Sequence, residues 1–145
     1  MLWIISFFVA WFFAFTLVGG NQIIKFLPVG IFSMFLQIAS DYLASKLDIY
    51  TLRKNVINFL GSSPFLSLGL AFTAGIFIAN FFPYERWQNL LYLLFFSALA
   101  TLFHALFIKF DYIDYKRYSF WGIFFLNILE ISAILGFFLC LFPHN

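Results

Sequence analysis

Charged residues are scarce in this chain of 145 residues: only 10% of them are Asp, Glu, Lys or Arg, and 64% are hydrophobic. An ordinary soluble domain is about 25% charged and about 45–50% apolar. A chain this short has too much surface for its volume to bury such an excess in water. The composition therefore excludes a water-soluble fold and indicates a protein whose surface faces lipid.

The few charges have little bias of sign, with a formal net charge of +2 at pH 7. Lys and Arg are scattered rather than gathered on one basic face, so nucleic-acid binding is not expected. Cys140 is the single cysteine, which excludes a disulfide within the chain. No CxxC or other His/Cys spacing typical of a metal site occurs, so we expect neither a metal nor a cofactor.

Sequence motifs of known enzymes are missing as well. The chain contains no HExxH, no G-x-S-x-G and no phosphate-binding Walker loop. It also lacks the paired carboxylates with which phosphate-transferring membrane enzymes hold metal ions. We therefore expect that the protein is not an enzyme, and an intramembrane enzyme acting on a lipid is the least supported hypothesis.

What the sequence does contain is a series of long apolar segments. A membrane-spanning helix needs about 20 mainly apolar residues. The segments that approach or exceed this length are 2–19, 26–46, 64–82, 87–109 and 119–142. They predict an all-α fold, a polytopic bundle of about five transmembrane helices that forms a single integral membrane domain over residues 1–145.

The first segment can also be interpreted as a signal peptide, with Val18 and Gly20 as a small-residue cleavage pattern. However, no Lys or Arg precedes the segment, and its apolar run is longer than the ~7–15 residues of a typical signal sequence. We therefore expect the first span to be retained. Cleavage would leave four spans.

Residues 48–60, between the second and third spans, are too polar to cross a membrane. Apolar residues recur there at helical spacing, while Arg53 and its polar neighbours fill the other face. This pattern predicts a short amphipathic helix that lies in the headgroup plane. A solvated connector of the same length is the alternative.

The distribution of Lys and Arg predicts an orientation in the membrane. With five spans, one side carries Lys46, Arg53, Lys54, Lys109, Lys116 and Arg117, and the opposite side carries Lys25 and Arg86. The positive-inside rule places the richer side in the cytoplasm. We therefore expect the N-terminus inside and the C-terminus outside.

Glu130 is the most unusual residue, because it lies close to the centre of the last span. A charged group there costs at least ~2.5–3.5 kcal/mol on insertion scales, so we expect a neutral carboxyl unless a cation lies nearby. Asn127 lies three residues earlier on the same helical face. Two interpretations stay open: Glu130 carries a proton or binds a cation, or it stabilises the bundle as a hydrogen-bonding carboxyl.

Two further polar groups fall in the cytoplasmic third of their spans. Asp41 follows Gln37 by four residues, so the two share a helical face, and we expect Asp41 to reach Lys46 or the headgroups. His104 lies on a polar stripe with Ser97 and Thr101 and is interpreted as a hydrogen-bonding packing element. Since Asp41 and His104 are predicted at similar depth, they could also pair.

Small residues repeat in the third span, where Ala71, Gly75 and Ala79 follow one another at four-residue spacing. Small residues at this spacing let two helix backbones approach closely. The stripe predicts a helix-packing face, and its partner lies either within the chain or on another subunit.

Three stretches of the chain can be compared with known sequences: LPVGIFSMFLQIASDYLASKLDIYTL, then two apolar spans joined by FFPYERWQN, then FDYIDYKRYSFWGIFF. In this layout the chain resembles a family of small uncharacterised multispanning membrane proteins of low-GC Gram-positive bacteria, many of them spore formers. The resemblance covers most of the chain after the first span. It departs at His104, where the family carries an acidic residue. The resemblance implies a bacterial cytoplasmic membrane and supplies no activity.

Two functions are compatible with these features. The first is a non-enzymatic subunit that oligomerises or packs against a larger membrane protein, which the small-residue stripe and the missing catalytic motifs favour. The second is a small proton-coupled transporter or channel that uses Glu130 at mid-membrane. Because a path through five helices is narrow, transport would require an oligomer. The expected partners are the lipid bilayer and either a second copy of the chain or a larger membrane protein.

One observation separates the two functions. If Glu130, Gln37 and Asn127 face a single cavity, transport is favoured. If Glu130 faces lipid within one chain, an interface between chains becomes the better explanation.

Overall fold

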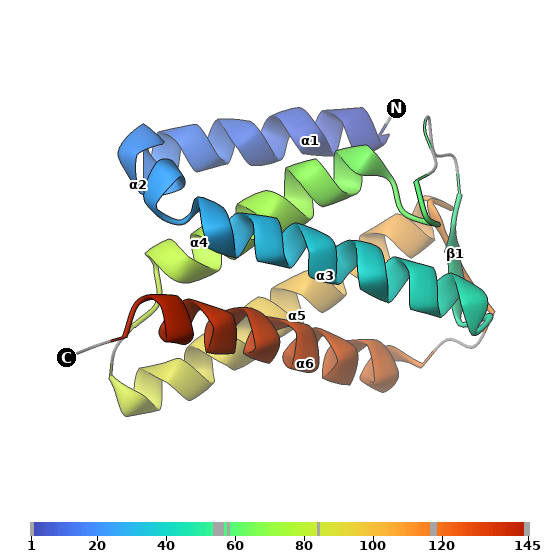
Figure 1. Ribbon diagram of the computed structural model, residues 1–145. Coiled ribbons are helices and arrows are strands. Elements are labelled where there is room, and N and C mark those ends of the chain that lie inside the picture. Colours follow the sequence, from blue (N-terminus) through green and yellow to red (C-terminus); the bar gives the residue numbers. More distant parts are fainter. Residues whose placement is uncertain (1, 54–56, 58, 84, 117–118, 144–145) are drawn as a thin grey trace.

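The computed structural model describes residues 2–53, 57, 59–83, 85–116 and 119–143, and the chain is mostly helical within them (Figure 1). Helix α1 (Leu2–Phe13) continues as the π-helical turn η1 (Ala14–Val18), which ends at Gly19 with a φ of 81°. The later elements are α2 (Gly20–Lys25), α3 (Leu27–Lys46), β1 (Tyr50–Leu52), the π-helical turn η2 (Leu66–Ala71), α4 (Phe72–Asn80), α5 (Arg86–Lys109), β2 (Ile113–Tyr115) and α6 (Phe120–Leu141).

The long helices run back and forth between two ends of a bundle (Figure 1). The start of the chain and the strands lie at one end, called the strand end below, and α2 and the end of the chain lie at the other. Helix α3 packs along η2 and α4, and α5 packs along α6. Contacts of α6 with α3 and α4 join these two helix pairs around a shared interior.

The structure confirms the all-α class, and each predicted span coincides with a helix whose ends lie within two residues of the prediction. Within the described residues, three helices are long and apolar enough to cross a membrane: Leu27–Lys46, Trp87–Lys109 and Phe120–Leu141. The apolar helices Leu2–Val18 and Leu66–Asn80 are shorter. Three candidate spans are consistent with a membrane protein, and the other two crossings stay predictions.

The predicted amphipathic helix over 48–60 is wrong where the structure describes that segment. Residues 50–52 form strand β1, which pairs antiparallel with β2. The register joins Tyr50 to Tyr115, Thr51 to Asp114 and Leu52 to Ile113. Residues 54–56 and 58 of the predicted helix lie outside the described part of the chain. Tertiary pairing overrides the helical spacing here, because it buries Tyr50 and Ile113, each only 3% exposed.

Helices α3 and α4 approach closely because small residues line their contact. A Cβ added at Gly75 would lie 2.7 Å from the Cβ of Ser33 and 2.9 Å from the carbonyl oxygen of Val29. The Ser33 hydroxyl also donates a 2.7 Å hydrogen bond to the carbonyl oxygen of Ala71. In the predicted small-residue stripe, Ala71 and Gly75 therefore contact α3 within the same chain, and Ala79 is buried as well.

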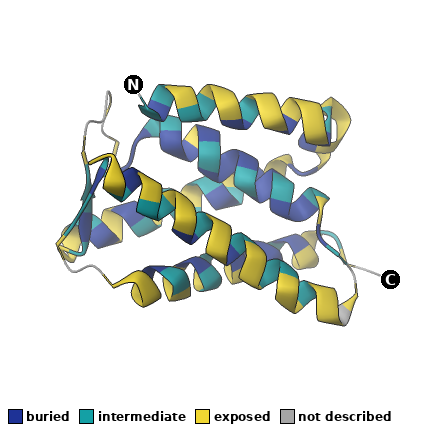
Figure 2. Ribbon diagram, turned by 180° about the vertical axis from the view of Figure 1, so that it is seen from behind, coloured by how far each residue is buried: buried dark blue, intermediate teal, exposed yellow. Residues whose placement is uncertain are grey.

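The outward faces of the helices are apolar. Figure 2 shows exposed residues running along these faces. Many of them are large and apolar, among them Phe8, Phe95 and Leu129, which are more than 60% exposed. An apolar surface this extensive is unusual in a soluble monomer. It suits contact with lipid, and it leaves the polar side chains of the interior as the candidates for function.

Candidate functional site

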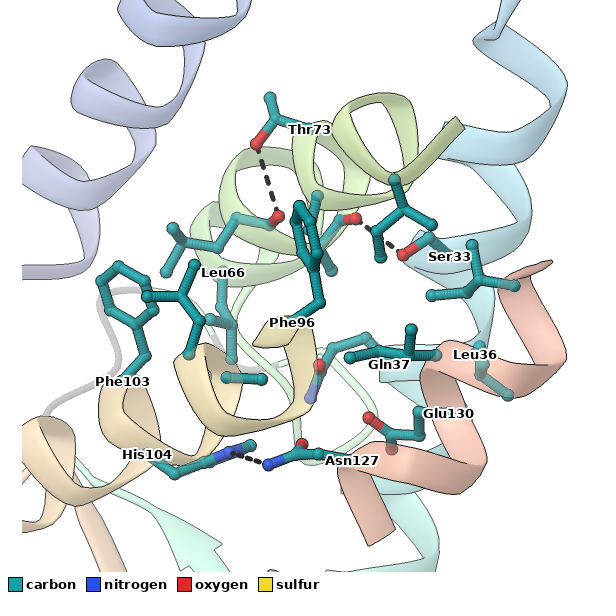
Figure 3. Close-up of a pocket in the computed structure, with 18 of the residues that line it drawn as sticks. Ser33, Leu36, Gln37, Leu66, Thr73, Phe96, Phe103, His104, Asn127 and Glu130 are labelled. Atoms are coloured by element: carbon teal, nitrogen blue, oxygen red, sulfur yellow. Dashed lines mark hydrogen bonds between the residues drawn. The ribbon is translucent and has the colours of Figure 1, made fainter. Parts of the chain in front are cut away.

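A cavity of about 370 Å³ lies among α3, η2, α4, α5 and α6 (Figure 3). Because pockets of ~300–1,000 Å³ accommodate small-molecule ligands, this cavity is large enough for one. Most of its wall is apolar, and phenylalanine rings form much of it. These are Phe77 from α4 and Phe96, Phe103 and Phe107 from α5.

Polar side chains from three helices meet at this cavity. Gln37 comes from α3, His104 from α5, and Asn127 and Glu130 from α6. Figure 3 shows Glu130 and Gln37 on the same side of the cavity, with His104 and Asn127 next to each other. The sequence predicts Gln37, His104 and the pair Asn127 and Glu130 on three different spans, and the structure brings all four residues to one cavity.

The amide of Asn127 is held by the polar stripe of α5. Its Nδ2 donates to Oγ1 of Thr101 at 2.9 Å and faces Nδ1 of His104 at 3.4 Å. The Thr101 hydroxyl donates in turn to the carbonyl oxygen of Ser97 at 2.7 Å. The apolar surroundings of His104 favour the uncharged form of its imidazole.

Asp41 does not line the cavity, but it is connected to it through Gln37. It is 1% exposed, and its Oδ1 accepts hydrogen bonds from Nε2 of Gln37 at 2.9 Å and from the Tyr50 hydroxyl at 2.6 Å. The expectation that Asp41 reaches toward the headgroups is therefore wrong, because these two donors hold the carboxyl inside the bundle. The pairing of Asp41 with His104 is not formed either, since His104 contacts Asn127.

The carboxyl groups of Asp41 and Glu130 lie close enough to interact electrostatically, with Ser40 beside Glu130. In the part of the chain that the structure describes, neither carboxyl forms an ion pair, and no Lys or Arg lines the cavity. A charged carboxylate among apolar side chains is costly unless it is paired. We therefore expect a proton or a cation on at least one of the two groups.

Tyr50 belongs to this polar cluster, although the sequence pattern assigned it to a surface helix. Burial raises the pKa of its phenol well above the usual value of 10.0, and the nearby Asp41 carboxyl raises the pKa further. The hydroxyl therefore remains protonated and keeps donating to Asp41. No local pattern indicates this role, because Tyr50 is positioned by a strand whose partner, β2, lies far along the chain.

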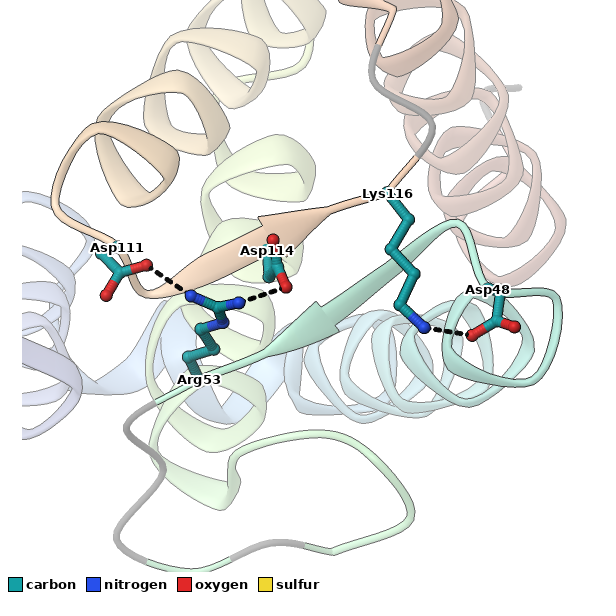
Figure 4. Close-up of polar contacts among 5 residues, drawn as sticks. All are labelled: Asp48, Arg53, Asp111, Asp114 and Lys116. Carbon is teal, nitrogen blue, oxygen red and sulfur yellow. Dashed lines mark hydrogen bonds and ion pairs between the residues drawn. The ribbon is translucent and has the colours of Figure 1, made fainter.

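The strand end of the bundle carries a second set of polar contacts (Figure 4). Arg53 forms ion pairs with Asp111, at 3.0 Å, and with Asp114, and Lys116 pairs with Asp48 at 2.6 Å. These side chains are between 35% and 70% exposed. They tie the segments around β1 and β2 together in solvent, and they are not part of the cavity lining.

The fold and the cavity together define a class: a helical protein with three helices able to cross a membrane and a cavity of small-molecule size among its helices. Compared with known proteins, the chain matches no family model, no curated protein and no solved structure. Among the residues that the structure describes, no group of three His, Cys, Asp or Glu side chains could hold a metal ion. The choice between a subunit and a transporter therefore depends on the chemistry of the cavity.

Proposed function

We propose that this chain is a small proton-coupled membrane transporter in which Glu130 carries the exchanged proton. The observation that supports the proposal most is the position of Glu130, Gln37 and Asn127 on a single cavity. A carboxyl group that faced lipid would instead have favoured an interface between chains. Intramembrane carboxyl groups that face a bundle interior commonly belong to substrate or proton pathways.

The surroundings of Glu130 suit proton exchange. Its carboxyl lies beside an apolar cavity that no Lys or Arg of the described residues lines, so the charged form is favoured when a cationic partner arrives. Hydrogen bonds join Tyr50 to Asp41 and Asp41 to Gln37, which lines the same cavity. This series of polar groups leads from the strand end of the bundle to the cavity. A proton could move along these polar groups instead of through the apolar side chains around them.

The proposal includes five membrane crossings, with the strand end in the cytoplasm of the cell. Lys46 and Lys109 end α3 and α5 at the strand end, and the positive-inside rule favours the cytoplasm for that end. The N-terminus is then inside and the C-terminus outside. The helix Leu2–Val18 covers about 25 Å at ~1.5 Å per residue. This length is slightly less than the ~30 Å hydrocarbon core, a mismatch that local thinning of the bilayer accommodates.

The alternative function, a non-enzymatic subunit, has less support from the cavity. The small-residue stripe and the missing catalytic motifs favour it, but Gly75 of the stripe packs against Ser33 and Val29 of the same chain. A second copy of the chain still fits the transport proposal, because the path through five helices is narrow.

Proton flux through liposomes tests the proposal. Purified protein is reconstituted into liposomes that contain a pH-sensitive dye, and a pH gradient is imposed in the presence of a mixture of small inorganic and organic cations that can act as the exchanging substrate. We expect wild-type flux above that of protein-free liposomes and a return to the protein-free rate in Glu130→Gln, which keeps the side-chain volume but cannot carry the proton. Glu85→Gln makes the same change at an exposed glutamate and should leave the flux unchanged.

Two results would contradict the proposal. Equal flux in wild type and Glu130→Gln would show that Glu130 carries no proton. Wild-type flux no higher than that of protein-free liposomes, together with a membrane partner that co-purifies, would favour the subunit function instead.

A further inference from the structure

The charge that the cavity can carry limits what it can bind. The ionisable groups near Glu130 are Asp41 on α3, Tyr50 on β1 and His104 on α5, and the described cavity lining from η2 and α4 adds none. The apolar surroundings of His104 favour a neutral imidazole, and the Tyr50 hydroxyl keeps its proton while it donates a hydrogen bond to Asp41. The cavity is therefore either neutral or negative. It attracts cations, and it offers an anion no positive partner among the described residues.

The walls of the cavity favour an organic cation over a metal ion. A metal ion needs several oxygen or nitrogen ligands, whereas no group of three acidic, His or Cys side chains gathers anywhere in the described chain. The rings of Phe77, Phe96 and Phe103 line the cavity instead. Aromatic faces attract alkylammonium groups through cation–π interactions, and they favour quaternary ammonium ions in particular.

The volume of the cavity agrees with this class of ligand. About 370 Å³ lies at the lower end of the ~300–1,000 Å³ range of small-molecule pockets. It suits a compact molecule with one or two apolar substituents. The phenylalanine rings offer no hydrogen bonds, so the ligand has to be mainly apolar apart from its charge.

We propose that the cavity binds a lipophilic organic cation, an ammonium ion with aryl or alkyl substituents, in exchange for the proton of Glu130. The O–H bond of the carboxyl breaks, the proton leaves to water, and the carboxylate pairs with the ammonium group. One positive charge replaces another, so the net charge of the site is conserved. This inference rests on the proposed transport function and specifies its substrate.

A matched pair of probes tests the charge requirement. Phenyltrimethylammonium and tert-butylbenzene have nearly the same shape and differ by the positive charge. The protein in detergent micelles is titrated calorimetrically with phenyltrimethylammonium in two buffers of different ionisation enthalpy, which gives affinity and proton release together. We expect saturable binding with release of about one proton per cation, and no displacement of the bound cation by tert-butylbenzene.

Two variants separate the carboxyl from the rings. Glu130→Gln should abolish both the proton release and most of the binding, while Glu85→Gln serves as the control. Phe96→Leu keeps an apolar wall without the aromatic face. It should weaken cation binding roughly 2- to 30-fold, which corresponds to the ~0.5–2 kcal/mol of a cation–π contact.

The outcomes distinguish this inference from the proposed function. If proton flux depends on Glu130 but the cation binds without releasing a proton, or tert-butylbenzene displaces it, the substrate class is wrong and the transport function stands. If neither flux nor binding depends on Glu130, both proposals fail. Unchanged affinity in Phe96→Leu would remove the rings from cation recognition.

Discussion

Polar residues gather in two regions of the molecule, at the strand end and around the cavity, and the regions differ in exposure and in partners. At the strand end, Arg53 and Lys116 are half exposed and pair with carboxylates of opposite charge. Around the cavity, Asp41 and Asn127 are 1% and 2% exposed. Their partners are neutral amide, hydroxyl and imidazole groups.

The exposed ion pairs and the buried polar groups are therefore expected to differ in how much each contributes to stability. Exposed ion pairs are screened by water and salt, so they stabilise a fold only slightly. A buried polar group that loses its partner costs ~1–3 kcal/mol, and a buried carboxyl without a counter-ion is costly whenever it is charged. We therefore expect the cavity region to combine structural sensitivity with function. The charges of the strand end should be nearly dispensable.

The largest effect should come from Trp3, which packs beneath the strand end and tests whether charges or apolar contacts hold that end. Trp3 is 0% exposed, stacks on Phe107 at 4.7 Å between ring centroids, and donates from Nε1 to the carbonyl oxygen of Arg53 at 3.3 Å. Trp3→Ala should lower the free energy of unfolding by about 3–5 kcal/mol, as measured by titration with SDS in mixed micelles. Trp121→Ala, at a residue 66% exposed on α6, should cost far less. Equal losses would mean that burial of Trp3 contributes nothing.

The next effect concerns Tyr50, which joins the two regions. Tyr50→Phe removes the hydroxyl that donates to Asp41 at 2.6 Å and leaves a buried carboxyl oxygen short of one partner. We expect a loss of about 1–3 kcal/mol in the same titration. Tyr42→Phe removes a hydroxyl from an exposed tyrosine of α3 and should have little effect. A loss at Tyr42 as large as that at Tyr50 would erase the distinction between buried and exposed polar groups.

Tyr50→Phe also tests the comparison through the pH dependence of the free energy of unfolding. Burial and the Asp41 carboxyl raise the pKa of Tyr50 above its usual value of 10.0. The unfolded chain therefore loses this proton near pH 10 while the folded chain keeps it. The corresponding stability is fully present below pH 10 and is lost as the pH rises further. Unfolding measured between pH 8 and 11 should show a steeper alkaline decline in wild type than in Tyr50→Phe, and identical slopes would contradict the assignment.

The smallest effect should follow from removing the charges of the strand end. Arg53→Ala eliminates the ion pairs with Asp111 and Asp114, but all three side chains are at least one-third exposed. We expect a smaller change in stability than in either preceding variant, and the change should shrink further at high salt, because surface pairs are screened. A loss as large as that of Trp3→Ala, and independent of salt, would overturn the view that these ion pairs are dispensable.

The sequence predicted the helices well because their signal is local. Long apolar runs ended by polar residues and prolines located α1–η1, α3, η2–α4, α5 and α6 within two residues of their observed ends, but they did not reveal the short helix α2. The strands could not be predicted in the same way. Residues 50–52 and 113–115 are short, and only their contact across the folded bundle makes either of them a strand. Apolar residues do recur at helical spacing in residues 48–60, but the pairing of β1 with β2 determines the secondary structure of residues 50–52.

For the candidate site, the sequence identified the polar residues but not their arrangement. Glu130, Asn127 and His104 stood out because each interrupts an apolar helix. Their convergence depends on how α5 and α6 are rotated against each other, which no single helix encodes. The buried position of Asp41 could not be predicted, because its hydrogen-bond donor Tyr50 lies on a strand that the local sequence pattern does not reveal. Without that donor, the headgroups were the expected partner.

The pairing of β1 with β2 also implies an order of events during synthesis. Helices α4 and α5 lie between the two strands in the chain, so β2 leaves the ribosome only after both helices have been made. Closing so long a connection costs entropy, which contacts among the intervening helices help to offset. A nascent chain that stops short of β2 lacks both the second strand and α6. The pairing that buries Tyr50 and the α6 wall of the cavity are therefore both supplied by residues from Ile113 onward.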